Sequence, residues 1–494
     1  MRKLTQLYPD YTAEIDAIEQ NGITPALLER IIAKHQGNAC YNRDLCNRYQ
    51  VLDGFVPISD RKPRFGDETD RALINHKINN DFFGEIVDFK TGYMAGRAIA
   101  YGYSDTVESL EETADVGDTM QEAKDARDAA AKAITDFVTR NNMYDVDMET
   151  TKLAAIAGYC GRLFYIDTDG NECVRVVPPY ETIILSKNGD ITQPEFGVRY
   201  YLTMDIHDYP VAKAEFYDAS QVTYYEGSLN SLTETGSQEH LFDFCPLQGV
   251  PNNREMLGDA EKVLSEIDAY DRALSDASNE IDSFANAYMV YEGVDITEEE
   301  AAKAQKSGVI VLRREGGKVS FLTKNINDAQ IEHHLDRLED NIYRFSQTPN
   351  LSDETFGTAS GVALKFKLTG LEAKCGMFQA KLQSAGVYMF KLLASSWAKK
   401  QIKVDPLQCT MDFKRNFPLD ILSEAQAATA LISAGLPKRV AYQLALSGID
   451  DIEYVMQLIE EEKEGIPSLM QDLPEDDRPS QENETTLVGN DDQS

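Results

Sequence analysis

Basic residues are scarce in this sequence of 494 residues. Lys and Arg together number 48, against 83 Asp and Glu, so the formal net charge is −35 at pH 7. Contacts to phosphate groups need cationic side chains, and this balance therefore argues against a general nucleic-acid binder. The simplest explanation of the acidic excess is solubility. A second explanation is that many like-charged copies surround a DNA duplex and let it pass without sticking.

The sequence also gives no support for disulfides, a signal peptide or membrane spans. The seven cysteines are odd in number and irregularly spaced, which does not form a disulfide framework. Cys40 and Cys46 have no second ligand pair at a matching distance, so buried free thiols in a reducing cytoplasm are favoured over zinc. The first ten residues have no apolar core, and no hydrophobic run reaches the length of a membrane span. We expect a soluble protein made inside a cell.

Catalytic motifs are missing as well. The nearest approach to a phosphate-binding loop is Gly316-Gly317-Lys318, but Leu312 and Val319 stand where a P-loop needs Gly and Ser or Thr. Runs of carboxylates at 298–300, 353–354 and 460–462 could in principle hold Mg²⁺ for nuclease chemistry. Consecutive side chains in each run face different directions, which favours solvated surfaces. We expect no enzyme activity, no cofactor and no metal, and keep a metal-dependent nuclease as the lesser alternative.

The patterns that are present predict an α+β fold that is mainly α. Residues 1–35 have helical apolar spacing, and a turn-rich stretch follows to about residue 72. Residues 75–100 are apolar on nearly every side, which predicts a buried helix capped by an Asn or Asp. Thr119 and Glu122 form a capping box for a helix ending near Arg140. Residues 161–244 alternate with period two and predict antiparallel β structure.

Three long helices dominate residues 256–399. A small β insertion separates the first two, a polar loop separates the second from the third, and a short strand at 410–413 follows. Narrow apolar rows on long helices pack them together and leave side surface for other subunits, which suggests the wall of a ring. Gly370, Gly376 and Gly386 in the third helix are candidate kinks or points of close approach. The expected packing positions of the first two helices are Ile267, Leu274, Ile281, Leu335, Leu338 and Ile342.

The polar loop at 346–360 contains Pro and Gly and is short of basic residues. Plain connections between helices usually take two to eight residues. A loop of about fifteen residues between rigid helices is more often functional.

Four collinear blocks resemble the portal proteins of tailed bacteriophages, in particular the family from long-tailed phages of Gram-positive hosts. The blocks are Ile78–Arg97; Pro251–Glu261 continuing to Ser283–Asn286; Ser360–Lys367 with Gly370–Glu372; and Ser447–Glu453 ending in Glu460–Glu462. The resemblance implies a ring, usually of twelve subunits, around a central channel.

By position, the resemblance also implies a division of the chain. Its parts are the wing (1–250), the first stem helix (251–288), the clip (289–325), the second stem helix (326–345), the tunnel loop (346–360), a long wing helix with a short strand (361–417) and the helical crown (418–463). The last segment, 464–494, is acidic and without periodicity, and we predict that it is disordered.

The function implied is a DNA channel at one capsid vertex, for genome packaging, head–tail joining and ejection. The implied partners are double-stranded DNA, a terminase, a head–tail adaptor, and the major capsid and scaffolding proteins, without a membrane. The protein would be assembled in the host cytoplasm and remain in the virion. The implied channel residues are Thr348, Pro349, Asn350, Ser352, Asp353, Glu354, Thr355 and Lys365. The implied partner-binding residues of the clip are Glu298, Glu299, Arg313, Arg314, Glu315 and Lys318. The main alternative is an oligomeric scaffold ring that never meets DNA.

Overall fold

The chain forms two compact units, residues 1–416 and 417–494, in a computed structural model. The structure describes residues 2–62, 74–104, 117–285, 288–292, 297, 299, 318–322, 328–351, 366–416, 421–446, 455–456 and 458–459.

Two helices open the first unit, α1 (Thr12–Asn21) and α2 (Pro25–Tyr49). The Thr24 hydroxyl accepts a hydrogen bond from the Leu27 amide and caps α2. The turn-rich stretch predicted after residue 35 begins later than expected, because α2 continues for another fourteen residues and turns and bends follow over 50–60. A Cβ at Gly37 would lie 2.1 Å from the Thr5 carbonyl oxygen. The glycine permits close packing of the N-terminal segment on α2.

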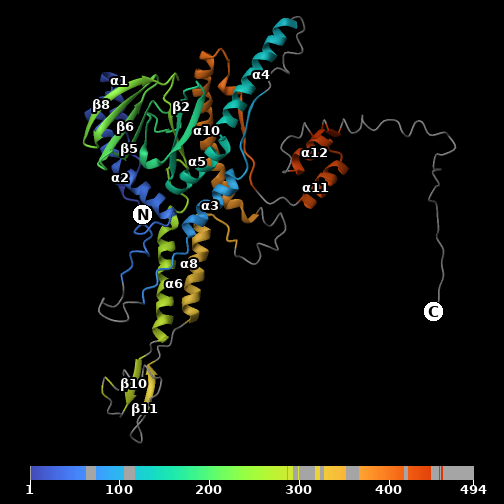
Figure 1. The fold of residues 1–494 in the computed structure, drawn as a ribbon. Helices are drawn as coiled ribbons and strands as arrows, with labels where there is room; N and C mark the ends of the chain where they lie inside the picture. Colours follow the sequence, from blue (N-terminus) through green and yellow to red (C-terminus); the bar gives the residue numbers. More distant parts are fainter. Residues whose placement is uncertain are drawn as a thin grey trace, which may run out of the picture. The chain divides into compact units, whose positions relative to one another are not determined.

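The predicted antiparallel β region is confirmed, and it forms two sheets. The first contains, in spatial order, β4 (Thr182–Leu185), β5 (Phe196–Met204), β6 (Pro210–Tyr217), β7 (Gln221–Ser228) and β8 (Ser231–Glu239). The second contains β3 (Glu172–Val177), β2 (Tyr159–Ile166) and β9 (Leu247–Pro251). Helices α1 and α2 pack on one face of the five-stranded sheet, as Figure 1 shows, and bury Ile15, Leu28 and Ile32 against Val198 and Phe216.

A second core lies where α4 (Gly117–Arg140), α5 (Met143–Ala157) and α10 (Thr369–Lys399) meet β2 and β3. The end of α4 at Arg140 was predicted, but it begins before the expected cap at Thr119. The expected short strand is β12 (Cys409–Asp412), which pairs with β1 (Ala100–Tyr103). Helix α10 is continuous, and a Cβ at Gly386 would meet the Met411 sulfur at 2.1 Å. That glycine therefore allows β12 to approach α10.

The paired helices are α6 (Leu264–Ala285) and α8 (Asp328–Ser346), which pack along each other (Figure 1). A 3-10 turn, η5 (Glu261–Val263), precedes α6. The first long helix thus begins at Leu264, and the prediction of a helix from 251 or 256 is wrong. Between the pair in sequence, β10 (Tyr288–Glu292) and β11 (Lys318–Leu322) form an antiparallel ladder.

The buried helix predicted in 75–100 is α3 (Phe82–Ala95), shorter than expected at its start. Its cap is Asp81, whose carboxylate accepts a hydrogen bond from the Gly84 amide at 3.2 Å. In the second unit, α11 (Ile421–Ser433) and α12 (Lys438–Ala445) are the short helices expected there. Gly435, at φ +94°, and Pro437 separate them. No helix in the described ranges is long and apolar enough to cross a membrane.

A neutral histidine lies inside the first core. The ring nitrogens of His35 lie 3.0 Å from the hydroxyl oxygens of Tyr200 and Tyr159, and the side chain has no exposed surface. Burial lowers the pKa of His35 to about 3, because water no longer stabilises the imidazolium. Between the folded and unfolded pKa values, His35 is therefore protonated in the unfolded chain and neutral in the folded chain.

This difference predicts a loss of stability in mild acid. Stability is complete above the unfolded pKa of about 6.5 and falls as pH decreases towards 3. Between about pH 6.5 and 4.5, His35 should remove about 2 kcal/mol from the free energy of unfolding. Urea denaturation, followed by the single tryptophan, Trp397, measures this slope. The His35→Gln variant should show a shallower slope over the same range, and equal slopes would contradict the assignment.

Candidate functional site

Residues of the first two sequence blocks meet where α6 and α8 join the β-containing part of the first unit. This region is here called the root of the helix pair. Residues 252–260, here called the connector loop, join β9 to η5 and α6 and turn across the end of α5. The amide of Asp259 donates to the Ala155 carbonyl at 2.7 Å, and the amide of Asn252 donates to the Gly158 carbonyl at 2.8 Å. Carbonyls at the end of α5 thus obtain partners from the loop. These bonds fix the direction in which α6 leaves the β-containing body.

Two glycines make this crossing possible. A Cβ at Gly158 would lie 2.0 Å from the Met256 carbonyl oxygen, and one at Gly258 would lie 2.2 Å from the Ile156 carbonyl oxygen. Gly158 also has φ +91°, which disfavours any other residue. The loop and the end of α5 are therefore in backbone-to-backbone contact.

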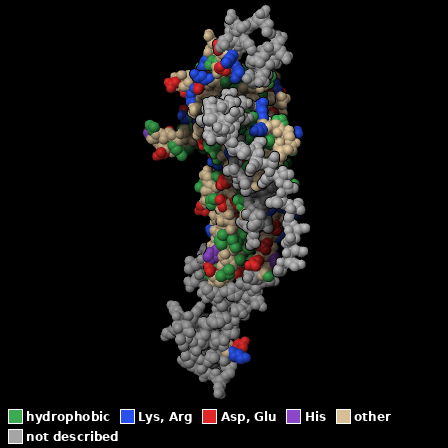
Figure 2. Space-filling view, turned by 90° about the vertical axis from the view of Figure 1, so that its right-hand side faces the viewer, with side chains coloured by type: hydrophobic (Ala, Val, Ile, Leu, Met, Phe, Trp, Pro, Cys, Tyr) green, Lys and Arg blue, Asp and Glu red, His purple; other side chains and the backbone are tan. Residues whose placement is uncertain are grey.

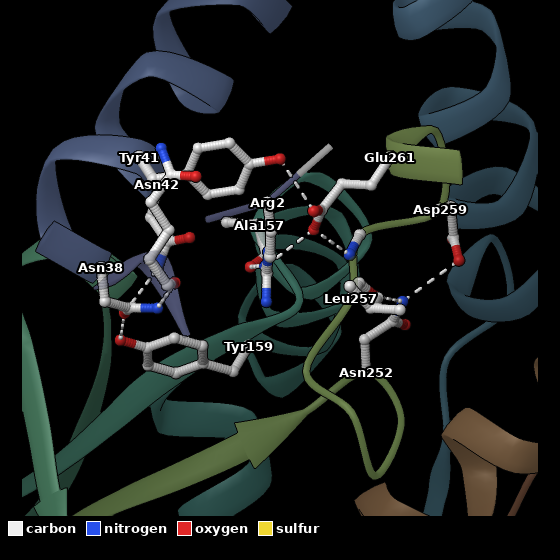
Figure 3. Close-up of polar contacts among 12 residues, drawn as sticks. Arg2, Asn38, Tyr41, Asn42, Ala157, Tyr159, Asn252, Leu257, Asp259 and Glu261 are labelled. Atoms are coloured by element: carbon white, nitrogen blue, oxygen red, sulfur yellow. Dashed lines mark hydrogen bonds and ion pairs between the residues drawn. The ribbon is translucent and has the colours of Figure 1, made fainter. Parts of the chain in front are cut away.

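The N-terminal segment attaches to the far end of the connector loop (Figure 3). The Arg2 guanidinium lies 2.7 Å from a Glu261 carboxylate oxygen, and it donates to the Ala157 carbonyl at 3.4 Å. The Tyr41 hydroxyl and the Gly258 amide also donate to Glu261, at 2.9 and 2.6 Å. Burial raises the pKa of Glu261, and these partners oppose the shift.

A buried charged cluster joins the two ends of the connector loop, at Asn252 and Asp259. Asp259 lies 3.0 Å from the Lys90 ammonium of α3 and 3.8 Å from the Lys374 ammonium of α10. Asn252 bridges the pair: its carbonyl oxygen accepts from Lys90 at 2.5 Å, and its amide donates to Asp259 at 3.1 Å. Lys90 also lies 4.8 Å from the centre of the Phe378 ring. Helices α3 and α10, which are far from the loop in the sequence, are thereby tied to one carboxylate.

The cluster holds two potential cations and one anion with little access to water. Burial alone would raise the pKa of Asp259, but Lys90 and Lys374 outweigh it and hold that pKa below its usual value. Burial, together with the positive charge of Lys90, lowers the pKa of Lys374, although Asp259 opposes the shift. Removing either partner of such a pair leaves an uncompensated charge, which is the costly case for a buried ion pair.

Aromatic side chains pack α3 against α6 and α8 at the root. Phe82 at the start of α3 makes edge-to-face contacts with Tyr270 of α6 and Tyr343 of α8, at ring-centre distances of 5.0 and 5.8 Å. The Tyr343 hydroxyl lies 2.9 and 3.0 Å from the two carboxylate oxygens of Glu85. Helix α3 therefore contacts both members of the pair.

A polar row on α6 was missed by the sequence analysis. Its side chains Asp271, Ser275 and Asn279 accept hydrogen bonds from the backbone amides of Asn80, Ile78 and His76, at 3.1, 2.9 and 2.7 Å. Residues 76–80 therefore run extended along α6, where the prediction placed helix. The spacing of four along one face was the available signal. Only the apolar rows of this helix were considered.

The predicted packing positions become less buried towards the end of α6. Ile267 and Ile342 are buried at the root, where they join the core of α3 and α5. Leu274, Leu335 and Leu338 are half-buried. Ile281 is 65% exposed, so the described residues leave most of its side chain uncovered. Hydrophobic side chains appear beside acidic ones on the visible face of the helix pair in Figure 2.

The predicted channel residues are described only in part. Thr348 is 4% exposed within this chain, and its amide donates to the Tyr343 carbonyl, so its place in a channel stays a prediction. Pro349 and Asn350 are half-buried, and the Asn350 amide donates to Glu339 at 2.9 Å. Ser352, Asp353, Glu354, Thr355 and Lys365 lie outside the described residues.

The clip prediction falls mostly outside the described residues too, at Glu298, Arg313, Arg314 and Glu315. Glu299 and Lys318 are described and exposed. Within the described ranges, no group of three His, Cys, Asp or Glu side chains is placed to hold a metal ion. All seven cysteines are free thiols; four are buried, but Cys40 is exposed, against the expectation for it.

Comparison with known proteins identifies the class. A family model described as "Phage portal protein, SPP1 Gp6-like" matches residues 30–468. The match covers the three- and five-stranded sheets, both paired helices and the connector loop. The chain therefore belongs to this phage portal protein family.

Two characterised relatives agree with the family match. The portal protein of Bacillus phage SPP1 is 23% identical over 428 residues, covering 83% of this chain and 80% of the relative. The portal protein of Clostridium phage phiCD119 is 23% identical over 434 residues, covering 84% of this chain and 90% of the relative.

The glycine contact at the root yields a prediction with a matched control. Gly170 also has positive φ, +80°, but a Cβ added there would meet nothing within 4 Å. Gly170→Ala should cost about 1–2 kcal/mol of unfolding free energy, from backbone strain alone. Gly158→Ala should cost that amount plus about 1–3 kcal/mol for displacing the Met256 carbonyl. Urea denaturation gives both values, and equal costs would show that the loop does not press on α5.

Proposed function

We propose that this protein assembles into a closed ring, usually of twelve copies, at one vertex of a phage head. Double-stranded DNA would pass through its channel during packaging by a terminase and during ejection. A head–tail adaptor would later bind the ring, and the major capsid and scaffolding proteins would surround it. The observation that carries the proposal is the family match from residue 30 to residue 468. The protein itself would act as a structural conduit, with the terminase supplying the work.

Two physical features support a ring around DNA. The apolar row of α6 continues past the root to Ile281, which the chain leaves uncovered and which a neighbouring copy could bury. Twelve copies would also carry on the order of −400 formal charges, since each carries −35. A field of that sign disfavours tight phosphate binding and suits a duplex that must slide.

Electron microscopy of the purified protein tests the ring. We expect class averages with a central hole and twelve- or thirteenfold symmetry. Ile281→Asp should reduce assembly strongly, because burying an unpaired carboxylate between copies is costly. Its circular dichroism spectrum should stay unchanged, since the side chain is 65% exposed within one chain. Unaltered rings from this variant would remove α6 from the interface, and monomers even with co-expressed scaffolding protein would contradict the ring.

We further propose that residues 346–360 contact the DNA in the channel and report head filling to the motor. The support is the length and polarity of the segment between two rigid helices. Because Thr348 is buried, the contact would come from the later residues of this segment.

Replacing residues 351–360 by Gly and Ser should change the length of packaged DNA, because the reporting contacts would be lost. Gel electrophoresis of DNA from assembled heads measures that length. Normal genome lengths with normal head yield would overturn this role and leave the ring untouched.

A further inference from the structure

Lys374 links α8 to α10, the two helices that precede and follow the loop at 346–360. It lies in the second turn of α10, and its ammonium donates to the carbonyl of Ser346, the last residue of α8, at 2.8 Å. The same ammonium lies 3.8 Å from Asp259 in the connector loop. Gly370 provides a second contact between these helices, because a Cβ there would lie 3.5 Å from the Gln347 Cβ. The start of α10 thus rests against the end of α8.

The other end of α10 is fixed in the body. Met389, Phe390, Leu393 and Trp397 are buried in the core formed with α4, β2 and β3. Between the two ends α10 is one uninterrupted helix of 31 residues, a length of about 46 Å. Interiors packed at such density transmit displacement instead of absorbing it. A displacement of the core formed with α4, β2 and β3 is therefore transmitted along α10 to Lys374.

From this arrangement we propose that Lys374 is a positioning residue that couples α10 to the carboxyl end of α8, and so couples the β-containing body to the stem pair. The proposal rests on the proposed portal function for its biological meaning, but its physical content concerns one chain. Lys90 and Asn252 would hold Asp259 in place, which leaves the Lys374 ammonium aimed at the Ser346 carbonyl. The coupling requires a donor at the tip of a long side chain.

Lys374→Met separates this coupling from simple packing. Methionine fills most of the same space, and Asp259 keeps Lys90 and Asn252 as partners, so the fold should survive. The bond to Ser346 is lost, and the last turn of α8 should open more often. Hydrogen–deuterium exchange should show about tenfold faster exchange for the amides of residues 343–348. Peptides from the buried half of α10, residues 388–397, should exchange at the wild-type rate.

Two variants serve as controls. Lys381→Met makes the same change at a half-buried position on the same helix and should leave exchange at 343–348 unaltered. Lys374→Arg keeps the charge and the donors and should restore most of the protection. The proposal is wrong if Lys374→Met leaves residues 343–348 fully protected. It is also wrong if exchange rises equally over the whole first unit, because that pattern means general destabilisation.

A second readout addresses function. Phage heads assembled with Lys374→Met should contain DNA of altered length, while those with Lys381→Met should contain DNA of normal length. If Lys374→Met shows faster local exchange but its heads contain DNA of normal length, the coupling exists within one chain and has no part in packaging. Absence of rings in the wild-type protein would refute the proposed function instead, and the exchange result would still decide the role of Lys374.

Discussion

The buried carboxylate of Asp259 is the interaction on which the arrangement of the first unit depends. It lies in the loop that turns the chain from β9 into α6, and only 3% of its side chain is exposed to water. A charge in that position must be neutralised by the protein, so Lys90 and Lys374 contact it from separate helices, and Asn252 contacts it from the same loop. The direction of the paired helices α6 and α8 follows from that requirement.

The same root explains why one unit can combine a rigid body with a long helix pair. Backbone contacts at Gly158 and Gly258 and the bonds of Glu261 close the loop from one side, and α3 closes it from the other. Beyond the root the pair depends on its own narrow row, which is half-buried at Leu335 and open at Ile281. A chain built in this way is secure at the centre and leaves apolar surface for another copy, which agrees with membership of a portal family.

Local signals predicted much of the fold. The Asp81 cap of α3 and the period-two strands each depend on neighbouring residues, and both are present. The failures share a different cause. The connector loop lies where helix was expected, because its conformation serves backbone contacts with the end of α5, which local spacing does not show. The Lys90–Asp259 pair joins residues far apart in sequence, so no spacing rule could identify it. Helix periodicity could have identified the polar row on α6, but it was applied only to apolar residues.

A double-mutant cycle between Lys90 and Asp259 tests most directly whether this pair organises the root. Unfolding free energies of Lys90→Met, Asp259→Asn and the double variant would be measured by urea denaturation with Trp397 fluorescence, since that side chain is 2% exposed in the same unit. Each single variant strands a buried group, so we expect a coupling free energy of about 2–3 kcal/mol, with the double variant less destabilised than the sum. Costs that add to within about 0.5 kcal/mol would contradict the account, because the two residues would then act independently.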